Sequence, residues 1–218
     1  CHPAFPFIFA HNRDEYRARP SCSVTLESET GVACGRDAEA GGTVLGIHSL
    51  RGHFAALTNR SCRRELPSSR TSRGRLVEYI LLHGPDSVKA FVSSRVFDGF
   101  HLVFGDVLTE DPQLEYIWCE APASGRDSAP SAAGSQEVNQ GIFVLSNENV
   151  SVGESPWPKS VWLRTAVSSF LEALPSDPLV HDVQEGLAEI MGHADAPPPG
   201  QEVASRSSIP DKRSGPFL

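Results

Sequence analysis

Residues 41–59 read Gly-Gly-Thr-Val-Leu-Gly-Ile-His-Ser-Leu-Arg-Gly-His-Phe-Ala-Ala-Leu-Thr-Asn, and they predict a β-hairpin. Residues 43–47 and 53–58 are extended in character. The segment Ser49-Leu50-Arg51-Gly52 between them supplies a turn, with a glycine that tolerates a positive φ. We therefore expect two neighbouring antiparallel strands here.

Helical spacing follows the hairpin. Ser72 can cap a first helix and Gly84 can end it. Its apolar face comprises Leu76, Val77, Ile80 and Leu81. Asp86 can cap a second short helix, and two more helices are predicted after Pro158 and over residues 179–191.

Short apolar runs predict the remaining strands, at residues 5–10, 100–107, 114–118 and 142–145. Hairpins and helices in this order indicate an α+β domain with an antiparallel sheet flanked by helices. We expect a single domain over residues 1–218. Residues 121–137 are small and polar and predict a disordered insertion, and residues 194–218 predict an irregular tail.

The bulk properties exclude some classes of protein. The net charge is −8 and the pI is near 5.5, which argues against a nucleic-acid partner. No apolar stretch approaches the ~20 residues of a transmembrane segment. The five cysteines are odd in number and lack a C-x-x-C pair, which favours reduced thiols and a cytoplasmic location. The sequence gives no indication of an oligomeric state.

Four polar residues, Asn12-Arg13-Asp14-Glu15, stand directly behind the apolar run of residues 5–10. Such groups at the edge of a core are costly unless they satisfy one another or bind something. Arg13 can present a planar fork to a carboxylate or phosphate, or it can pair with Asp14, Glu15 or Asp37. Both interpretations stay open.

This tetrad, followed by Tyr16 and Arg19-Pro20, resembles the signature of the NRDE family, which includes the Transport and Golgi organisation protein 2 homologues. Further segments resemble the family in the same order along the chain: residues 35–37, 39–46, 54–59, 72–74, 99–106, 145–147 and 156–159. The resemblance implies an αββα sandwich like that of N-terminal nucleophile hydrolases. It also implies a role in Golgi organisation and protein secretion, with possible Golgi association and haem or lipid handling.

The nucleophile of such hydrolases is the first residue of the mature chain, whose own α-amino group is the general base. Cys1 fits that role only as the true mature N-terminus. Pro3 and Pro6 disfavour a central strand here, and we expect an opening strand of about ten residues to precede Cys1. The end of the chain similarly lacks the family's last strands. We therefore expect the sequence to be incomplete at both ends, with its nucleophile missing.

Other polar residues at strand ends are further site candidates. Thr58-Asn59 can supply hydrogen-bond donors of the oxyanion-hole type, or it can cap the following turn. Ser146-Asn147 has the same ambiguity. The Gly41-Gly42 pair most simply answers a backbone need. No metal site is expected, and no haem motif is present; His2, His11, His48 and His53 are formal candidates for an axial ligand.

Three functions remain open. The first is an intracellular protein of Golgi organisation and secretion that binds a small hydrophobic ligand such as a lipid, acyl-CoA or haem. The second is a cysteine N-terminal nucleophile hydrolase acting on amides or thioesters. The third is a non-catalytic interaction scaffold. The candidate site residues are Cys1, Asn12, Arg13, Asp14, Thr58, Asn59, Ser146 and Asn147.

Overall fold

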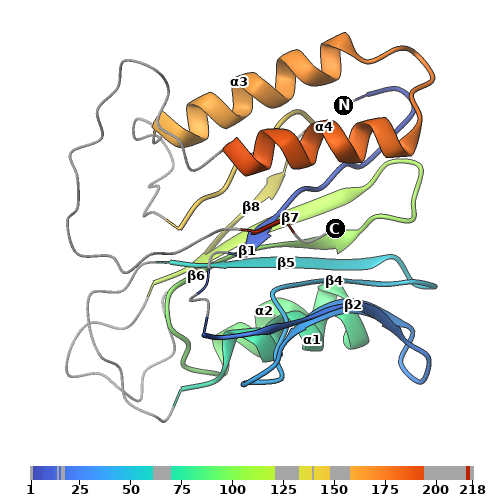
Figure 1. Cartoon of the computed structure of the whole chain (residues 1–218). Coiled ribbons are helices and arrows are strands. Elements are labelled where there is room, and N and C mark those ends of the chain that lie inside the picture. Colours follow the sequence, from blue (N-terminus) through green and yellow to red (C-terminus); the bar gives the residue numbers. More distant parts are fainter. Residues whose placement is uncertain are drawn as a thin grey trace, which may run out of the picture. The chain divides into compact units, whose positions relative to one another are not determined.

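The computed structural model describes residues 2–13, 15, 18–60, 70–120, 133–138, 140–147, 158–193 and 215–216 (Figure 1). The chain divides into two compact units. Unit 1 comprises residues 1–20, 140–144 and 150–218, and unit 2 comprises residues 21–139 and 145–149. The expected single domain stays a prediction, and each unit is described by itself below.

Unit 2 is built on a seven-stranded antiparallel sheet whose spatial order follows the chain. The predicted hairpin is confirmed, and Gly52 in its turn has a φ of +73°. The strands are β2 (Ser21–Glu27), β3 (Val32–Asp37), β4 (Leu45–His48), β5 (His53–Asn59), β6 (Phe100–Asp106), β7 (Gln113–Cys119) and β8 (Ala133–Val138).

Helices α1 (Arg73–His83) and α2 (Val88–Ser93), with the 3-10 helix η1 (Pro85–Ser87) between them, cover one face of this sheet (Figure 1). The predicted apolar face of α1 is fully buried, and Gly84 ends the helix at φ +88°. Ser72 is the N-cap residue of α1, as predicted, although its hydroxyl makes no cap hydrogen bond. The capping prediction for Asp86 is wrong, because Asp86 lies inside η1. The core against α1 comprises Ala55, Leu57, Phe100, Leu102, Phe104 and Ile117, among others.

The residues that alternate with this core point to the opposite sheet face, because successive strand residues face opposite sides. Phe54, Ala56, Val103 and Tyr116 on that second face are also buried. The second face of β5, β6 and β7 therefore carries buried apolar residues, and Thr58 and His101 lie on the same face.

Part of the predicted disordered insertion is a strand. Residues 133–138 form β8, which pairs antiparallel with β7, while residues 121–132 lie outside the described residues. A Cβ on Gly134 would lie 2.2 Å from the Trp118 ring, so the indole rests directly on the β8 backbone. Main-chain pairing and this aromatic cover stabilise a segment whose own side chains offer little to a core.

Unit 1 contains α3 (Pro158–Ala173), α4 (Val180–His193) and the short strands β1 (Asn12–Arg13) and β9 (Gly215–Pro216), which pair antiparallel. Both C-terminal helices were predicted. The predicted strands at residues 5–10 and 142–145 are wrong: both segments are irregular and at most half-buried. Pro6 within the first segment lacks the N–H that a central strand needs. The prediction of an irregular tail over residues 194–218 is wrong at residues 215–216, which form β9 and pair with β1.

No helix among the described residues is both long and apolar enough to cross a bilayer.

We expect Gly134→Val to destabilise the protein by about 1–3 kcal/mol, because the added side chain collides with the Trp118 ring. Urea unfolding followed by circular dichroism measures the change. Ser135→Val is the matched control, since Ser135 is exposed on the other face of β8. Equal stability of the two variants would show that Trp118 does not pack on this strand.

Candidate functional site

Two polar segments far apart in sequence meet on the second sheet face of unit 2. Thr58, at the end of β5, donates a hydrogen bond from its hydroxyl to the side-chain oxygen of Asn147, 89 residues further along the chain. Thr58 is half-buried and Asn147 is exposed. This contact joins two of the residues that sequence analysis selected from separate strand ends.

The neighbours of these two residues are not brought into the same contact. Asn59 pairs in register with Phe100, a residue of the core against α1, so it belongs to the face opposite Thr58 and is exposed there. Ser146 is half-buried, and its hydroxyl finds no hydrogen-bond partner among the described residues. The expected Thr58-Asn59 donor pair is thus split by strand alternation.

His101 lies beside Thr58 and contacts Tyr116, and sequence analysis did not select either residue. His101 is directly opposite Thr58 in the β5–β6 register. Its Nδ1 is 2.7 Å from the Tyr116 hydroxyl. His101 is only 1% exposed, and Tyr116 is only 4% exposed. The Tyr116 ring also stacks on Trp118, with centroids 5.4 Å apart. We call Thr58, His101, Tyr116 and Asn147 the Thr58 cluster.

One feature of the sequence points to His101 as a candidate site residue, namely the strand in which it lies. It is the one imidazole in Phe-His-Leu-Val-Phe-Gly-Asp, a strand whose other members up to Gly105 are all buried. Yet only the register with β5 shows that this histidine shares a face with Thr58. No local motif marks Tyr116, whose role depends on the pairing of β6 with β7.

The electrostatics of the cluster favour a protonated phenol. Burial raises the pKa of Tyr116 to about 12, against an opposing influence of the Arg60 guanidinium. Arg60 follows β5, is 11% exposed in its side chain and forms an ion pair with Glu120 at 3.2 Å. At neutral pH the Tyr116 phenol therefore keeps its proton, and the His101 tautomer decides which of the two groups donates in their contact.

The arrangement suits recognition of a hydrogen-bond acceptor. Because Thr58 donates to the Asn147 oxygen, the amide nitrogen of Asn147 lies on the other side and carries two N–H donors. Ala56 and Val103, one row along the same face, are apolar and buried. A few polar groups set into an apolar surface are typical of small-molecule sites.

The described residues of the NRDE tetrad make contacts within unit 1. The Asn12 amide nitrogen donates to the Met191 carbonyl at 3.0 Å, while its side-chain oxygen is buried without a hydrogen-bond partner among the described residues. Arg13 and Arg19 both pair with Glu15, at 3.8 and 3.4 Å. Of the partners expected for Arg13, Glu15 is therefore observed. Asp14 and Cys1 lie outside the described residues.

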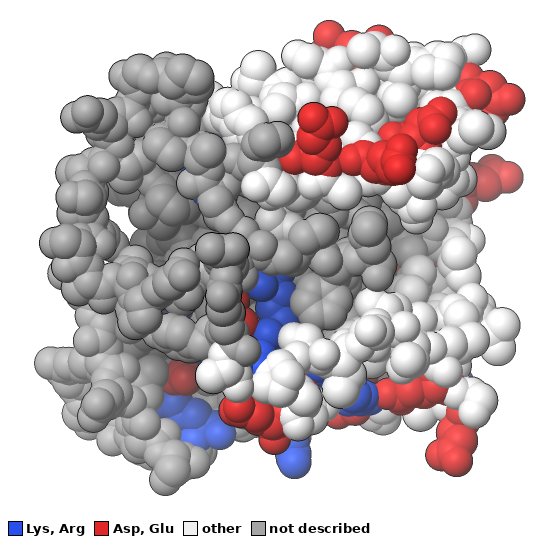
Figure 2. Space-filling view, viewed as in Figure 1, with Lys and Arg blue, Asp and Glu red and all other residues white. Residues whose placement is uncertain are grey.

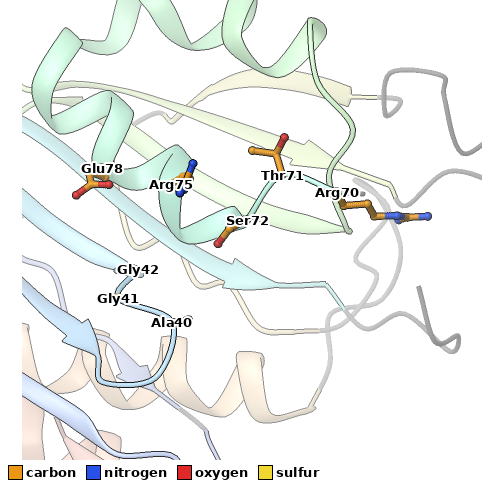
Figure 3. A pocket seen from close by; sticks show the side chains of 8 residues that line it. All are labelled: Ala40, Gly41, Gly42, Arg70, Thr71, Ser72, Arg75 and Glu78. Atoms are coloured by element: carbon orange, nitrogen blue, oxygen red, sulfur yellow. The ribbon is translucent and has the colours of Figure 1, made fainter. Parts of the chain in front are cut away.

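A groove of about 600 Å³ opens at the start of α1, away from the predicted site residues (Figure 3). Two of its charged residues are paired within the fold, Arg70 with Asp98 at 2.7 Å and Glu78 with Arg36 at 3.1 Å. Its lining comprises Ala40, Gly41, Gly42, Arg70, Thr71, Ser72, Arg75 and Glu78.

The glycine pair in this lining answers a backbone need, as predicted. Gly41 has a φ of +69°, and a Cβ on Gly42 would lie 3.2 Å from the Gly74 backbone. On the face shown in Figure 2, acidic side chains stand on several sides of the basic ones, so the described residues of this view form no continuous basic surface.

The four histidines named as formal candidates for an axial ligand make other contacts. His2 uses both ring nitrogens, donating to the Pro175 carbonyl at 3.0 Å and accepting from the Ala4 amide at 3.2 Å. His48 accepts from two backbone amides, and burial lowers its pKa. His53 donates to the Leu81 carbonyl. His11 stacks on Phe9, which is 37% exposed and forms no apolar slot.

No group of three His, Cys, Asp or Glu side chains in the described part of the chain could hold a metal ion.

We expect the phenol of Tyr116 to titrate near pH 12. Since this pKa lies above the ordinary value of about 10, the fold favours the protonated phenol. The resulting stability of roughly 2–3 kcal/mol is present below about pH 10 and is lost as the pH rises towards 12. Ultraviolet titration of phenolate in the wild type and in Tyr116→Phe measures the pKa. A Tyr116 that ionises near pH 10, the ordinary value for tyrosine, would contradict the burial argument.

Comparison with known proteins shows the family of the chain. The family model described as Transport and Golgi organisation 2 matches residues 1–214. The human Transport and Golgi organization protein 2 homolog is 30% identical over 188 residues, which cover 81% of this chain and 63% of the relative. The chain thus spans less than two thirds of that relative's length.

A solved structure shares the fold. The Caenorhabditis elegans N-acylethanolamine-hydrolyzing acid amidase ortholog superposes with a TM-score of 0.52 at 12% identity, over 84% of this chain and 79% of that one. This likeness confirms the predicted α+β fold of the N-terminal nucleophile hydrolase type. The family match and the human relative confirm the NRDE resemblance: the chain belongs to the Transport and Golgi organisation 2 family.

Proposed function

We propose that this protein binds a small hydrophobic molecule that carries an acyl carbonyl group, such as a lipid amide or an acyl thioester, at the Thr58 cluster. The observation that carries the proposal is the Thr58–Asn147 hydrogen bond, which unites two polar strand ends 89 residues apart in sequence. This contact supports a single site that the fold assembles, and it argues against the alternative that Thr58 and Asn147 each cap a separate turn.

The chemistry of the cluster favours a carbonyl oxygen as the bound group. The cluster combines hydroxyl, amide, imidazole and phenol groups, all of which can donate hydrogen bonds, and a carbonyl oxygen accepts up to two. Thr58 acts through Asn147 and is a positioning residue.

The surroundings of the cluster favour an apolar remainder of the ligand. Ala56 and Val103 lie in the next row of the same sheet face, and the Tyr116 and Trp118 rings stack alongside. Burial of alkyl chain against such side chains contributes about 0.8 kcal/mol per methylene group. An acyl chain with a carbonyl at one end has both required features.

A cysteine N-terminal nucleophile hydrolase is the second candidate. The fold likeness to an amidase that, by its title, hydrolyses N-acylethanolamines favours this class of substrate. The Asn147 donors would then stabilise an oxyanion instead of a ground-state carbonyl. Replacing the cysteine at the family's nucleophile position with alanine in the full-length protein should abolish turnover of acyl substrates; unchanged turnover would exclude this mechanism.

The cellular role is also part of the proposal. The family description supports a function in Golgi organisation. A part in protein secretion, and a place in the cytoplasm in association with the Golgi, belong to the proposal alone. Binding of a lipid-like ligand is a simple physical link to membrane traffic. A scaffold without a ligand is the remaining alternative, and it predicts that changes in the Thr58 cluster alter only stability.

We expect Thr58→Val and Asn147→Ala each to weaken binding of oleoylethanolamide or oleoyl-coenzyme A by about 3- to 10-fold, the effect of one hydrogen bond of roughly 0.5–1.5 kcal/mol. Isothermal titration calorimetry on the full-length protein, below the micellar concentration of each probe, measures the affinity. Two probes are needed because the amide and the thioester share the carbonyl but differ in their leaving groups.

Thr25→Val is the matched control, since Thr25 lies on the exposed edge strand β2 of the same sheet and should leave the affinity unchanged. Asn59→Ala tests the face assignment: a loss as large as that of Thr58→Val would place the site on the other side of β5. Absence of binding of both probes to the wild type would refute the proposed function.

A further inference from the structure

We propose that His48 is an acid-sensitive latch. In its neutral form it holds the β4–β5 turn (residues 49–52) closed, and uptake of a proton opens this turn and releases the C-terminal end of α1. The proposal is independent of the proposed function and concerns a different part of unit 2. It rests on the backbone partners of two neighbouring imidazoles, those of His48 and His53.

The His48 ring holds the turn from inside. The residue is 5% exposed, and its Nδ1 accepts hydrogen bonds from the backbone amides of Leu50 at 3.3 Å and Arg51 at 3.4 Å. A Cβ on Gly31 would lie 3.0 Å from the His48 Cε1, so the β2–β3 turn packs on the ring. Because a backbone amide only donates, Nδ1 is an acceptor, and the single proton of the neutral imidazole is on Nε2.

The closed turn supplies partners for the last carbonyl groups of α1. The Arg51 guanidinium donates to the Leu82 carbonyl at 3.0 Å, and the His53 Nδ1 lies 3.2 Å from the Leu81 carbonyl. Both carbonyls belong to the last turn of the helix, where C=O groups have no partner within the helix itself. A change in the conformation of the turn is therefore transmitted to the end of α1.

The two imidazoles respond differently to a proton. A carbonyl only accepts, so His53 carries its proton on Nδ1, and a second proton on Nε2 leaves its contact with Leu81 intact. A second proton on His48 must go to Nδ1, because Nε2 already carries one. The new Nδ1–H then faces two amide N–H groups, and both hydrogen bonds inside the turn are lost. His48 is therefore the residue at which acid acts.

The groups around His48 oppose a positive charge on its ring. Burial lowers the pKa of His48, and the positive charges of Arg51 in the turn and of a protonated His53 on β5 lower it further. The neighbour on β3, Val32, is apolar, and the β2–β3 turn and the end of α1 contribute a glycine and backbone carbonyls. The carboxylate of Asp106 on β6 stands opposite His53.

The pH range of the latch follows from the direction of this shift. An ordinary histidine has a pKa of about 6.5, and the pKa of His48 in the fold is lower, so the fold favours the neutral ring. The stability that this contributes is fully present above about pH 6.5 and is lost as the pH falls through the pKa of the folded state. Over that range the equilibrium constant for opening should rise about 10-fold per pH unit and then level off.

Nuclear magnetic resonance on the full-length protein tests the latch. At pH 7.5 the long-range ¹H–¹⁵N spectrum should show His48 as the Nε2–H tautomer. As the pH falls below about 6.5, the amides of Leu50 and Arg51 should lose their protection from hydrogen exchange together with the titration of the His48 ring. The amide of Leu57, which donates to the Val44 carbonyl, should keep its protection.

Three variants separate the latch from a general sensitivity to acid. His48→Asn keeps a side-chain oxygen near the place of Nδ1 but takes up no proton, so its turn should stay closed at pH 5. Arg51→Gln removes a positive charge and should raise the pKa of His48. His181→Asn is the matched control, since the His181 side chain on α4 is 72% exposed, and it should leave the transition of the wild type unchanged.

The contradicting outcomes are distinct. An Nδ1–H tautomer of His48 at pH 7.5 would overturn the proposal before any titration. Equal loss of protection at Leu50 and Arg51 in the wild type and in His48→Asn would assign the acid response to another group. Simultaneous loss at Leu57 would show global unfolding in place of a local opening. Unchanged protection of the two turn amides in the wild type between pH 7.5 and pH 5 would overturn the proposal whether or not His48→Asn folds.

Discussion

The pairing of β5 with β6 is the constraint on which the rest of unit 2 depends. Seven consecutive residue pairs, from His53–Asp106 to Asn59–Phe100, hold these two strands in one register. The register sends Leu57, Leu102 and Phe104 into the core against α1 and sends Thr58 and His101 to the other face. A slip of one residue would place the imidazole in that core.

The elements that rest on local pattern were predictable. The hairpin of residues 45–59, the buried stripe of α1 and both C-terminal helices follow from short-range spacing and glycine positions. The family and the hydrolase-type fold came from collinear motifs, because periodicity alone does not specify how strands of distant segments pair. Thr58 and Asn147 were each selected, but their contact required the folded chain.

The failures share a physical cause, which is that partners distant in sequence decide local structure. Residues 133–138 have little strand propensity of their own, and β7 with the Trp118 ring makes them a strand. Residues 5–10 are apolar but find no pairing partner among the described strands. Asn59 was grouped with Thr58 by adjacency, whereas alternation along β5 separates them. The sequence does not predict His101 and Tyr116 as site residues, because neither belongs to a motif and their contact depends on the pairing of β6 with β7.

The composition of the second sheet face argues for function over packing. On the core face, the same strands carry Leu57, Phe100 and Leu102, so an apolar solution is available to this backbone. A buried imidazole and phenol contribute only about 0.5–1.5 kcal/mol net when hydrogen-bonded and cost about 1–3 kcal/mol when left unpaired. A well-packed apolar pair would carry no such liability. The polar pair therefore adds little to stability, and its position beside the Thr58–Asn147 contact is what a carbonyl-binding site requires.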